Sequence, residues 1–388
     1  MKILVIAYGY SGSDVSESYS SFQLVRALRQ NHQVTVMTKD AVDDPDAICI
    51  PVAPTLAGTQ YYRALKLDYF VFMWKAYRLA RKIVGDFDIV HHISPISLRY
   101  PNILCNLPKP FIWGPVGGGV PYPTAFRDVE KREPWIYQLR ALDRLRLFLD
   151  PLLVNTLKRA SAIVLTSSAT AAMLPKRYRE KSSVIPEAFE AASVPPASPS
   201  DDIEYVFSSG RLVPYKGMEF LVKAFAQQCR SGNVELRISG DGPETGRLMQ
   251  LVKELQMEGR IKLLGRVSRE RNYELMAGSL FCVFPALNEA FGHVNLEAMA
   301  AGKPVIVTDW GGPSDIVENG ISGFKVIPTD PEQFVNDMGA RIQQLIDDKA
   351  LREQMAINAM ARVRTHFSWE FVARKYDLLY KSLTHFDT

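Results

Sequence analysis

Cysteine is scarce in this sequence, and its arrangement indicates neither a disulfide framework nor a metal site. The four cysteines among 388 residues stand far apart, and none belongs to a CxxC pair. We expect them to be small buried side chains in a reducing compartment. Long apolar runs are missing too. No stretch approaches the ~20 residues that span a bilayer, and the run at residues 3–7 is too short for a secretory signal. We therefore expect a cytoplasmic protein, at most peripheral on the inner face of the plasma membrane.

Several loops that commonly bind nucleotides or metals are also absent. The glycine-rich stretch at residues 238–244 lacks the Gly-Lys-Ser/Thr ending of a P-loop and the glycine spacing of the dinucleotide fingerprint. No Asp-x-Asp pair ends a predicted strand in the C-terminal half, where Asp241, Asp309 and Asp315 stand alone. We expect neither a metal ion nor a cofactor.

Acidic residues are depleted in the first half of the chain. Residues 1–190 hold 24 Lys and Arg against 17 Asp and Glu, a net charge of +7, whereas the remainder holds 22 against 25, a net charge of −3. The basic excess could serve an anionic acceptor or a membrane surface, or it could be ordinary variation in solvated charge. We expect no nucleic-acid partner.

The sequence does contain a twice-repeated alternation of short apolar runs and helical segments. Such Val- and Ile-rich runs, separated by helices, indicate parallel sheets covered on both faces. The runs lie at residues 2–7, 33–38, 47–51, 88–93, 110–113 and 162–166, and again at 203–209, 234–239, 261–264, 280–285, 304–308 and 323–326. A proline-rich stretch at 186–202 separates the two series and indicates a linker.

The predicted fold is therefore α/β, with two Rossmann-like domains facing each other across a cleft. Ligands bind at the carboxyl ends of the strands in such sheets. We place the first domain at residues 1–186, the linker at 187–202 and the second domain at 203–370. A C-terminal helix at 371–388 could pack back toward the N-terminal domain.

The strongest local pattern lies at residues 288–305, between two apolar strands of the second domain. Gly292 would let the backbone approach a ligand, and the helix that follows would offer free N–H groups to an anion. Glu289 precedes the turn, and Glu297 sits on the helix. The alternative is an ordinary helix with a packing face of small residues.

A second pattern, Gly-Arg-Leu-Val-Pro-Tyr-Lys-Gly at residues 210–217, follows the first strand of that domain. Arg211 can bind phosphate oxygens in pairs, and Lys216 supplies a mobile point charge. Two cations on a loop can also be simple solvated charge. Their predicted place opposite the helix start at residue 293 favours an anion site.

These two patterns, the Gly-Asp-Gly-Pro-Glu stretch and the Ala-x-Gly-x-Pro-Val ending resemble the retaining glycosyltransferases of family 4. Their order and spacing match closely over residues 203–330 and more loosely over 2–7, 24–38 and 88–92. The resemblance implies a GT-B enzyme that moves a sugar, with retention and without metal, from a UDP- or GDP-sugar to an acceptor hydroxyl. The first domain would bind a glycan or lipid-linked acceptor, and the second the nucleotide sugar, in polysaccharide- or lipopolysaccharide-type synthesis.

The resemblance also assigns roles to residues. Arg211 and Lys216 would neutralise the donor diphosphate, Glu289 would bind the donor sugar, and Glu297 would bind the ribose. The loop at Arg266 and Val267 would lie beside the base. The residues implied at the nucleotide sugar are Gly12, Gly210, Arg266, Val267, Phe291, Gly292, His293, Val294, Asn295 and Glu297.

Two departures from the family pattern concern histidine. Many relatives have a histidine after the strand matching residues 110–113, where this chain continues into a glycine-rich loop at 114–119. That loop could offer backbone N–H groups or simply turn. His91 and His92 end the preceding strand and point to opposite faces; we take His92 as the candidate catalytic histidine, with a core histidine as the alternative. His293, where relatives have an aliphatic residue, could contact phosphate or cap the helix.

Two other functions remain open: a nucleotide-sugar epimerase of the same fold, and a non-catalytic nucleotide-sugar-binding protein.

Residues 60–84 predict a basic amphipathic helix. Its apolar side is formed by Leu65, Tyr69, Phe72, Ala76, Leu79 and Ile83, beside six cations and one acid. Residues 131–149 add three aromatic residues and four arginines. Such helices lie in lipid interfaces, so we predict docking on an anionic membrane and a lipid-linked acceptor. The alternative is that both helices bury these faces against the domain core.

Overall fold

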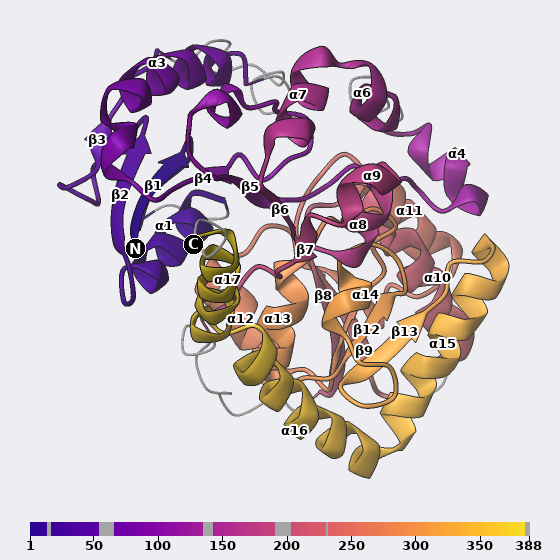
Figure 1. Cartoon of the computed structure of the whole chain (residues 1–388). Helices are drawn as coiled ribbons and strands as arrows, with labels where there is room; N and C mark the ends of the chain where they lie inside the picture. Colours follow the sequence, from indigo (N-terminus) through magenta and orange to yellow (C-terminus); the bar gives the residue numbers. More distant parts are fainter. Residues whose placement is uncertain (14–16, 54–65, 135–142, 191–202, 230–231, 385–388) are drawn as a thin grey trace. The chain divides into compact units, whose positions relative to one another are not determined.

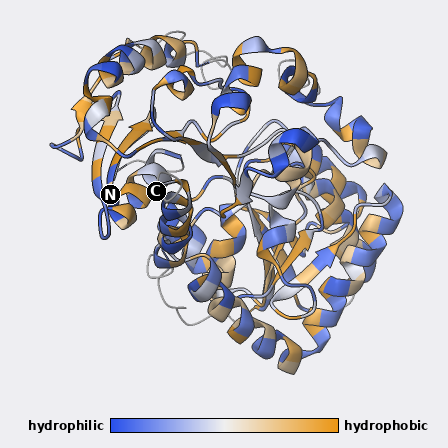
Figure 2. Ribbon diagram, viewed as in Figure 1, coloured by the Kyte–Doolittle hydropathy of each residue, from blue (hydrophilic) through white to orange (hydrophobic). Residues whose placement is uncertain are grey.

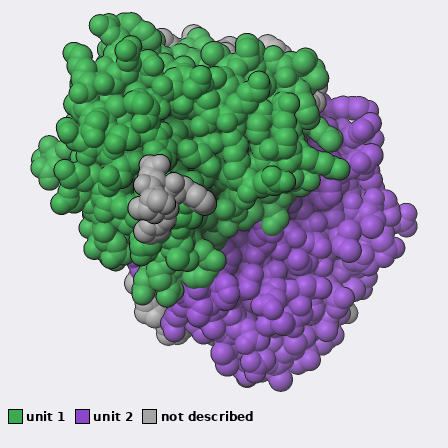
Figure 3. Space-filling model, in the orientation of Figure 1, with its two compact units in different colours: residues 1–119, 139–188, 369–388 green, residues 120–138, 189–368 purple. Residues whose placement is uncertain are grey.

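The chain forms two compact units, each built on a parallel sheet (Figure 3). The structure, a computed structural model, describes residues 1–13, 17–53, 66–134, 143–190, 203–229 and 232–384. Unit 1 comprises residues 1–119, 139–188 and 369–388, and unit 2 comprises 120–138 and 189–368. Residues 120–138, which the predicted boundaries assign to the N-terminal domain, thus belong to unit 2, and the C-terminal helix belongs to unit 1.

The sheet of unit 1 has seven strands in the order β3-β2-β1-β4-β5-β6-β7, all paired in parallel (Figure 1). The strands are β1 (Lys2–Ala7), β2 (Gln33–Thr38), β3 (Ile48–Cys49), β4 (Ile89–Ser94), β5 (Phe111–Val116), β6 (Ala162–Leu165) and β7 (Ser182–Val184). The helices are α1 (Glu17–Leu28), α3 (Asp68–Ile83), α6 (Asp143–Leu149), α7 (Pro151–Arg159), α8 (Ser168–Met173), α9 (Lys176–Arg179) and α17 (Trp369–Thr384), with short turns η1 (Val84–Asp86) and η2 (Ile103–Asn106).

Both faces of this sheet are covered, which explains why its strands are continuously apolar. Leu4 and Ile6 of β1 enter a core with α3, α6 and α7, whereas Ile3 and Val5 enter a second core with α1 and α17. Side chains that alternate along a strand therefore bury on opposite sides of the sheet.

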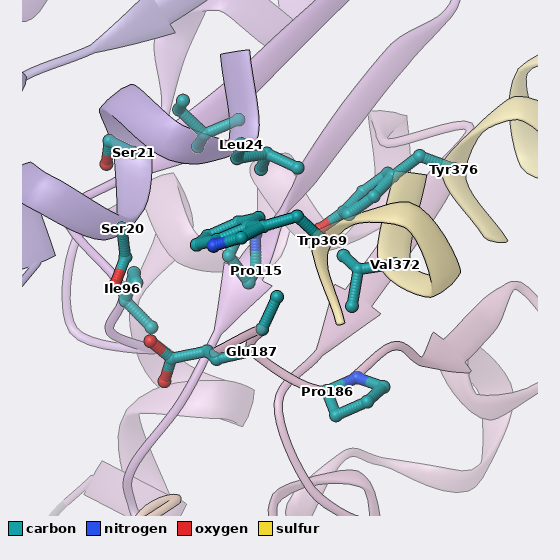
Figure 4. A pocket seen from close by; sticks show the side chains of 12 residues that line it. Ser20, Ser21, Leu24, Ile96, Pro115, Pro186, Glu187, Trp369, Val372 and Tyr376 are labelled. Atoms are coloured by element: carbon teal, nitrogen blue, oxygen red, sulfur yellow. The ribbon is translucent and has the colours of Figure 1, made fainter. Parts of the chain in front are cut away.

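Helix α17 completes the second core of unit 1. Tyr376 and Tyr380 are buried there, and Trp369 points into a small, mainly apolar pocket between Leu24 of α1 and Pro115 of β5 (Figure 4). The last helix of the chain therefore covers the sheet that the first strand begins.

The sheet of unit 2 has six strands in the order β10-β9-β8-β11-β12-β13, again all parallel. The strands are β8 (Tyr205–Ser209), β9 (Glu235–Ser239), β10 (Ile261–Leu263), β11 (Cys282–Phe284), β12 (Val305–Thr308) and β13 (Gly323–Val326). The helices are α4 (Arg127–Glu130), α10 (Met218–Gln228), α11 (Thr245–Glu254), α12 (Arg269–Gly278), α13 (His293–Ala300), α14 (Pro313–Ile316), α15 (Pro331–Asp347) and α16 (Lys349–His366), with turns η3 (Thr124–Phe126) and η6 (Pro214–Lys216).

Two apolar cores sandwich this second sheet as well. Helices α10, α11 and α15 cover one face, and α12, α13 and α16 cover the other. Figure 2 shows the helices striped with hydrophilic and hydrophobic residues, as expected when one side of each helix is solvated. The prediction of two parallel-sheet Rossmann-like domains is confirmed. Across the described residues, we find no helix with the length and apolar character needed to cross a membrane.

Candidate donor site

The candidate site of unit 2 begins where β8 ends. Gly210 has a φ of +147°, and the chain then turns through η6, whose last residue is Lys216. Gly217 follows with a φ of +67°, and a Cβ there would lie 2.1 Å from the carbonyl oxygen of Pro285. Only glycine allows this approach, which brings Lys216 next to the loop that leaves β11.

Lys216 meets Glu289 across this contact. The ammonium group donates a hydrogen bond to the Glu289 carboxylate, and the two side chains are 18% and 21% exposed. Burial lowers the pKa of Lys216, but the Glu289 carboxylate and Tyr215 together outweigh burial, and the net shift is upward. Lys216 is therefore held as a cation, paired with an acid, in a partly desolvated place.

Helix α13 begins at the same place. Its N-cap residue Gly292 has a φ of +97°, and a Cβ there would lie 2.6 Å from the amide nitrogen of Asn295. Asn295 is buried and donates a hydrogen bond of 2.8 Å to the Gly292 carbonyl. Lys216, Glu289, Val294 and Asn295 line one small pocket, so the ion pair faces the helix start. The positive end of a helix dipole points there.

Glu297 lies further along α13. Tyr273 of α12 donates a hydrogen bond of 3.4 Å to its carboxylate, and burial raises the Glu297 pKa. Arg269 donates bonds of 3.0 and 3.1 Å to the Tyr273 oxygen. Tyr273 and Arg269 were not predicted as site residues, because nothing in the sequence of α12 marks them.

Other predicted contacts lie on exposed loops. Arg211 is exposed and donates a hydrogen bond of 2.6 Å to the Tyr215 hydroxyl. Arg266 is exposed and Val267 half-buried in the loop after β10. Gly265 of that loop accepts a 2.8 Å bond from Gly240, so this loop and the loop after β9 lie side by side.

Two of the residues predicted at the nucleotide sugar, Phe291 and Gly12, need qualification. The Phe291 ring is buried in the core of unit 2 and contacts the half-buried His293 ring edge-on at 5.1 Å between centroids. Only the backbone of Phe291 could therefore touch a ligand. Gly12 belongs to unit 1, where its N–H donates a 2.8 Å bond to the Asp43 carboxylate.

His92 is misassigned as a catalytic residue. Its side chain is 1% exposed in the core beneath α3, next to Tyr69, and burial lowers its pKa to about 3. His91 on the other face is buried too. It bonds the Gly114 carbonyl through Nε2 at 2.7 Å and the Tyr380 hydroxyl through Nδ1 at 2.8 Å. Both are core histidines, because both faces of this sheet are covered.

A segment at residues 120–134 braces the site, and sequence reasoning missed it. Asn288 donates a 2.9 Å bond to the Val120 carbonyl, and Trp310 donates a 2.8 Å bond to the Pro121 carbonyl. The buried Glu133 carboxylate accepts a 3.2 Å bond from the Tyr215 N–H, at the loop that carries both cations.

The same segment is anchored by ion pairs and an aromatic cluster. Arg132 bonds Glu219 at 2.5 Å and Glu244 at 3.1 Å. Phe126 packs edge-on against Phe220 and Phe334, with centroids 5.2 and 5.5 Å apart. We call residues 120–134 the brace. No motif in the brace itself reveals these contacts.

Within the described part of the chain, no cluster of three or more His, Cys, Asp or Glu side chains could hold a metal ion.

Comparisons with known proteins give the family. The model described as Glycosyltransferase Family 4 matches residues 19–192, and the model described as Glycosyl transferases group 1 matches residues 193–362. An uncharacterized glycosyltransferase of Methanocaldococcus jannaschii is 31% identical over 181 residues, which cover 47% of this chain and 45% of that protein.

Two named enzymes are similar to a comparable extent. The alpha-D-kanosaminyltransferase of Streptomyces kanamyceticus is 32% identical over 41% of this chain and 40% of its own length. The N-acetyl-alpha-D-glucosaminyl L-malate synthase of Bacillus anthracis is 32% identical over 42% of each chain. The chain thus spans less than half the length of the curated relatives it matches.

Solved structures share the fold over the whole chain. A sucrose-phosphate synthase from Thermosynechococcus elongatus has a TM-score of 0.72 at 21% identity and covers 99% of both chains. The Anabaena protein HepE in complex with UDP has a TM-score of 0.70 at 20% identity, over 99% of this chain and 100% of that one. The lipopolysaccharide outer core galactosyltransferase WaaB, in its apo form, has a TM-score of 0.67 at 16% identity, over 99% and 100%. Two consecutive family models and two parallel-sheet Rossmann-like domains place this chain among the group 1 glycosyltransferases of family 4, with the GT-B fold.

Proposed function

We propose that this protein transfers a sugar from a nucleoside diphosphate sugar to an acceptor hydroxyl, in the synthesis of a glycan or glycolipid. The observation that carries the proposal is the Lys216–Glu289 ion pair, placed in one pocket with the start of α13. A cation and a helix N-terminus attract phosphate, and a carboxylate beside them can bind sugar hydroxyls.

The ion pair suggests how the donor enters. A diphosphate that reaches the α13 N-terminus offers Lys216 a new anionic partner. Glu289 then loses its internal cation partner and can accept hydrogen bonds from the sugar. Arg211 stands on the same loop, exposed and already hydrogen-bonded to Tyr215. The donor would therefore replace one ion pair by a Lys216–phosphate contact and by hydrogen bonds from the sugar hydroxyls to the Glu289 carboxylate.

The nucleoside side of the donor has its own candidate contacts. Glu297, held by Tyr273, is the group proposed for the ribose hydroxyls. The loop at Arg266 and Val267 is proposed for the base. Because the fold neighbour HepE is described in complex with UDP, we propose a uridine nucleotide first and keep GDP as the alternative.

We propose a retaining reaction that needs no metal. Negative charge builds on the departing diphosphate as the sugar–phosphate bond breaks. Preorganised donors at that position stabilise such charge most effectively. Lys216, Arg211 and the α13 N-terminus would supply this stabilisation, and the diphosphate would accept the acceptor's proton.

We propose that the acceptor is carried by a lipid and that the protein acts peripherally at a membrane. The fold neighbour WaaB is described as acting on the lipopolysaccharide outer core. The basic excess of residues 1–190, a net +7, fits an anionic acceptor or surface.

Calorimetric titration of the purified protein with UDP, GDP and ADP tests the donor class. We expect one diphosphate to bind, and Lys216→Ala to weaken it strongly. Lys349→Ala, at an exposed Lys–Glu pair on α16, serves as the matched control. Product analysis with the matching sugar donor, with and without acceptor, separates transfer from epimerisation. Failure of all three diphosphates to bind would refute the proposal.

A further inference from the structure

Helix α3 presents its hydrophobic residues on two sides. The side that the sequence predicts for lipid, including Tyr69, Phe72 and Ala76, is buried against the sheet of unit 1. The expectation that this side meets a membrane is therefore wrong. The solvent side still carries large apolar groups, 44–53% exposed, namely Leu67, Phe70, Val71 and Trp74.

The same solvent side continues as a row of cations toward the end of α3. Lys75, Arg78, Arg81 and Lys82 are all exposed. The Arg78 guanidinium lies 4.8 Å from the centre of the Trp74 ring, and Lys75 bonds the Pro51 carbonyl. No carboxylate of the described residues lies within 4 Å of these four groups. Their charge is therefore not neutralised by a neighbouring acid.

A second exposed apolar group lies on α6 and α7. Its members, 51–68% exposed, are Leu145, Phe148, Leu149 and Leu152. Arg144, Lys158 and Arg159 are exposed on the same two helices, whereas Arg146 is paired with Asp150. Hydrophobic and basic residues are again combined.

Both groups lie on one side of unit 1. Helices α3 and α7 both contact η2, and α3, α6 and α7 contribute to the same core on one face of the sheet. Figure 1 shows them along one edge of the ribbon, over that face. Among the described residues, 17 large hydrophobic side chains are exposed, and eight of them belong to these two groups. The three aromatic ones, Phe70, Trp74 and Phe148, all belong there.

We propose that the outer sides of α3, α6 and α7 form one docking surface for an anionic lipid bilayer. A lipid interface has an acyl boundary, which exposed apolar and aromatic side chains can enter, and a layer of headgroups, which the flanking cations can contact. Charge complementarity selects an anionic bilayer as the occupant, because the surface has seven exposed cations and none of them forms an ion pair with a carboxylate of the described residues. This inference rests on the peripheral membrane association proposed above and assigns the surface that makes it, whereas it does not depend on sugar transfer.

Vesicle sedimentation of the full chain tests the surface. We expect binding to phosphatidylcholine vesicles that contain phosphatidylglycerol, weakened by salt, and little binding to pure phosphatidylcholine. Neutralising Arg78, Arg81 and Lys82 to Gln should weaken binding roughly a hundredfold at low salt, at about fivefold per cation. Phe70→Ser with Trp74→Ser should weaken it about tenfold.

Helix α17 supplies matched controls. It has the same length of 16 residues and covers the opposite face of the same sheet. Leu378→Ser and Arg374→Gln with Lys375→Gln change exposed residues there and should leave vesicle binding within twofold. Thermal melting checks that every variant folds.

Three results would overturn the proposal. The wild-type protein could ignore anionic vesicles at low salt. The α17 variants could lose as much binding as the α3 variants, which would indicate general charge attraction. Alternatively, the protein could form a dimer that Phe70→Ser with Trp74→Ser dissociates, which would assign the surface to a second copy of this chain. Each of these readouts is independent of sugar transfer.

Discussion

Removing the Lys216 ammonium group tests the proposed donor site most directly. In the wild-type protein this group is 18% exposed and pairs with the Glu289 carboxylate. A charge-assisted contact to a ligand contributes about 1.5–3 kcal/mol, so Lys216→Ala should weaken diphosphate binding by about 10- to 150-fold.

The affinity for the diphosphate should fall by more than the missing contact alone explains, because Lys216→Ala leaves the Glu289 carboxylate without its partner. Two like charges ~5 Å apart, at an effective dielectric constant near 20, repel by about 3 kcal/mol. Partial exposure reduces this to roughly 1 kcal/mol. The phosphate would then meet a carboxylate instead of an ammonium group, at a further cost of about fivefold.

A double variant separates the two effects. Lys216→Ala with Glu289→Gln removes the repelling charge, so it should bind the diphosphate about fivefold more tightly than Lys216→Ala alone. Glu289→Gln alone should bind the diphosphate almost as the wild type does, yet lose sugar transfer. Isothermal titration calorimetry with the diphosphate, and a transfer assay with its sugar, measure both properties.

The pH dependence of the affinity difference between the wild type and Lys216→Ala follows from the raised pKa of Lys216. A lysine with a raised pKa keeps its charge below its ordinary titration range and loses it only above that range. The affinity difference should therefore stay constant between about pH 7 and about pH 9. If the single and double variants bind alike, or if Lys349→Ala weakens binding as much as Lys216→Ala, the assignment is wrong.

Three further predictions concern the brace, the buried histidines and metals. Glu133→Gln keeps the shape of the brace but weakens its bond to the Tyr215 N–H, so diphosphate affinity should fall several-fold with little change in Tm; unchanged affinity contradicts the bracing role. Burial lowers the pKa of His91 to about 4 and of His92 to about 3, so both are neutral when folded. Their contribution to the free energy of unfolding is complete above the ordinary histidine pKa and is lost as pH falls toward these values. When the free energy of unfolding is measured in urea at several pH values, His92→Leu should therefore lose less stability on acidification than the wild type. An equal loss in both proteins would contradict this account of His92. Sugar transfer should survive EDTA, and a loss that manganese or magnesium restores would establish a metal requirement.

The nearness of Lys216 to the loop that carries Glu289, although not their ion pair, could be predicted from the sequence for a topological reason. Each residue follows a buried strand, β8 and β11, and these strands are neighbours in the sheet of unit 2. Carboxyl ends of neighbouring parallel strands meet at one edge. The glycines that permit the close approach, Gly217 and Gly292, are visible in the same motifs.

His92 shows where the same reasoning fails. Alternation along β4 correctly places His91 and His92 on opposite faces of the sheet. It does not say whether a face is open, and both faces here are covered, one by α3 and the other by α17. Helix α3 covers the face with His92, and its apolar periodicity does not say which surface it meets. Helix α17 covers the face with His91 and lies almost 300 residues later in the chain, where no local pattern around β4 could reveal it.

Helix α3 shows the related limit of helical periodicity. A period of 3.6 residues finds the apolar stripe with Tyr69, Phe72 and Ala76, but it cannot tell whether protein or lipid covers that stripe. The sheet of unit 1 covers it. The residues left outside, Phe70 and Trp74, stand out only after the buried stripe has been assigned, because their spacing alone marks no second face.

The brace belongs both to the core of unit 2 and to the surroundings of the proposed donor site. Its Phe126 completes an aromatic cluster with Phe220 of α10 and Phe334 of α15, so unit 2 needs residues that precede its first strand by about 80 positions to close its own core. The brace also supplies the carbonyls and the carboxylate that hold the Asn288, Trp310 and Tyr215 segments. The core contact and the donor-site contacts are made by one continuous segment. Packing at Phe126 and the position of the loop proposed to bind phosphate are therefore linked, and the proposed donor site cannot be understood from residues 203–368 alone.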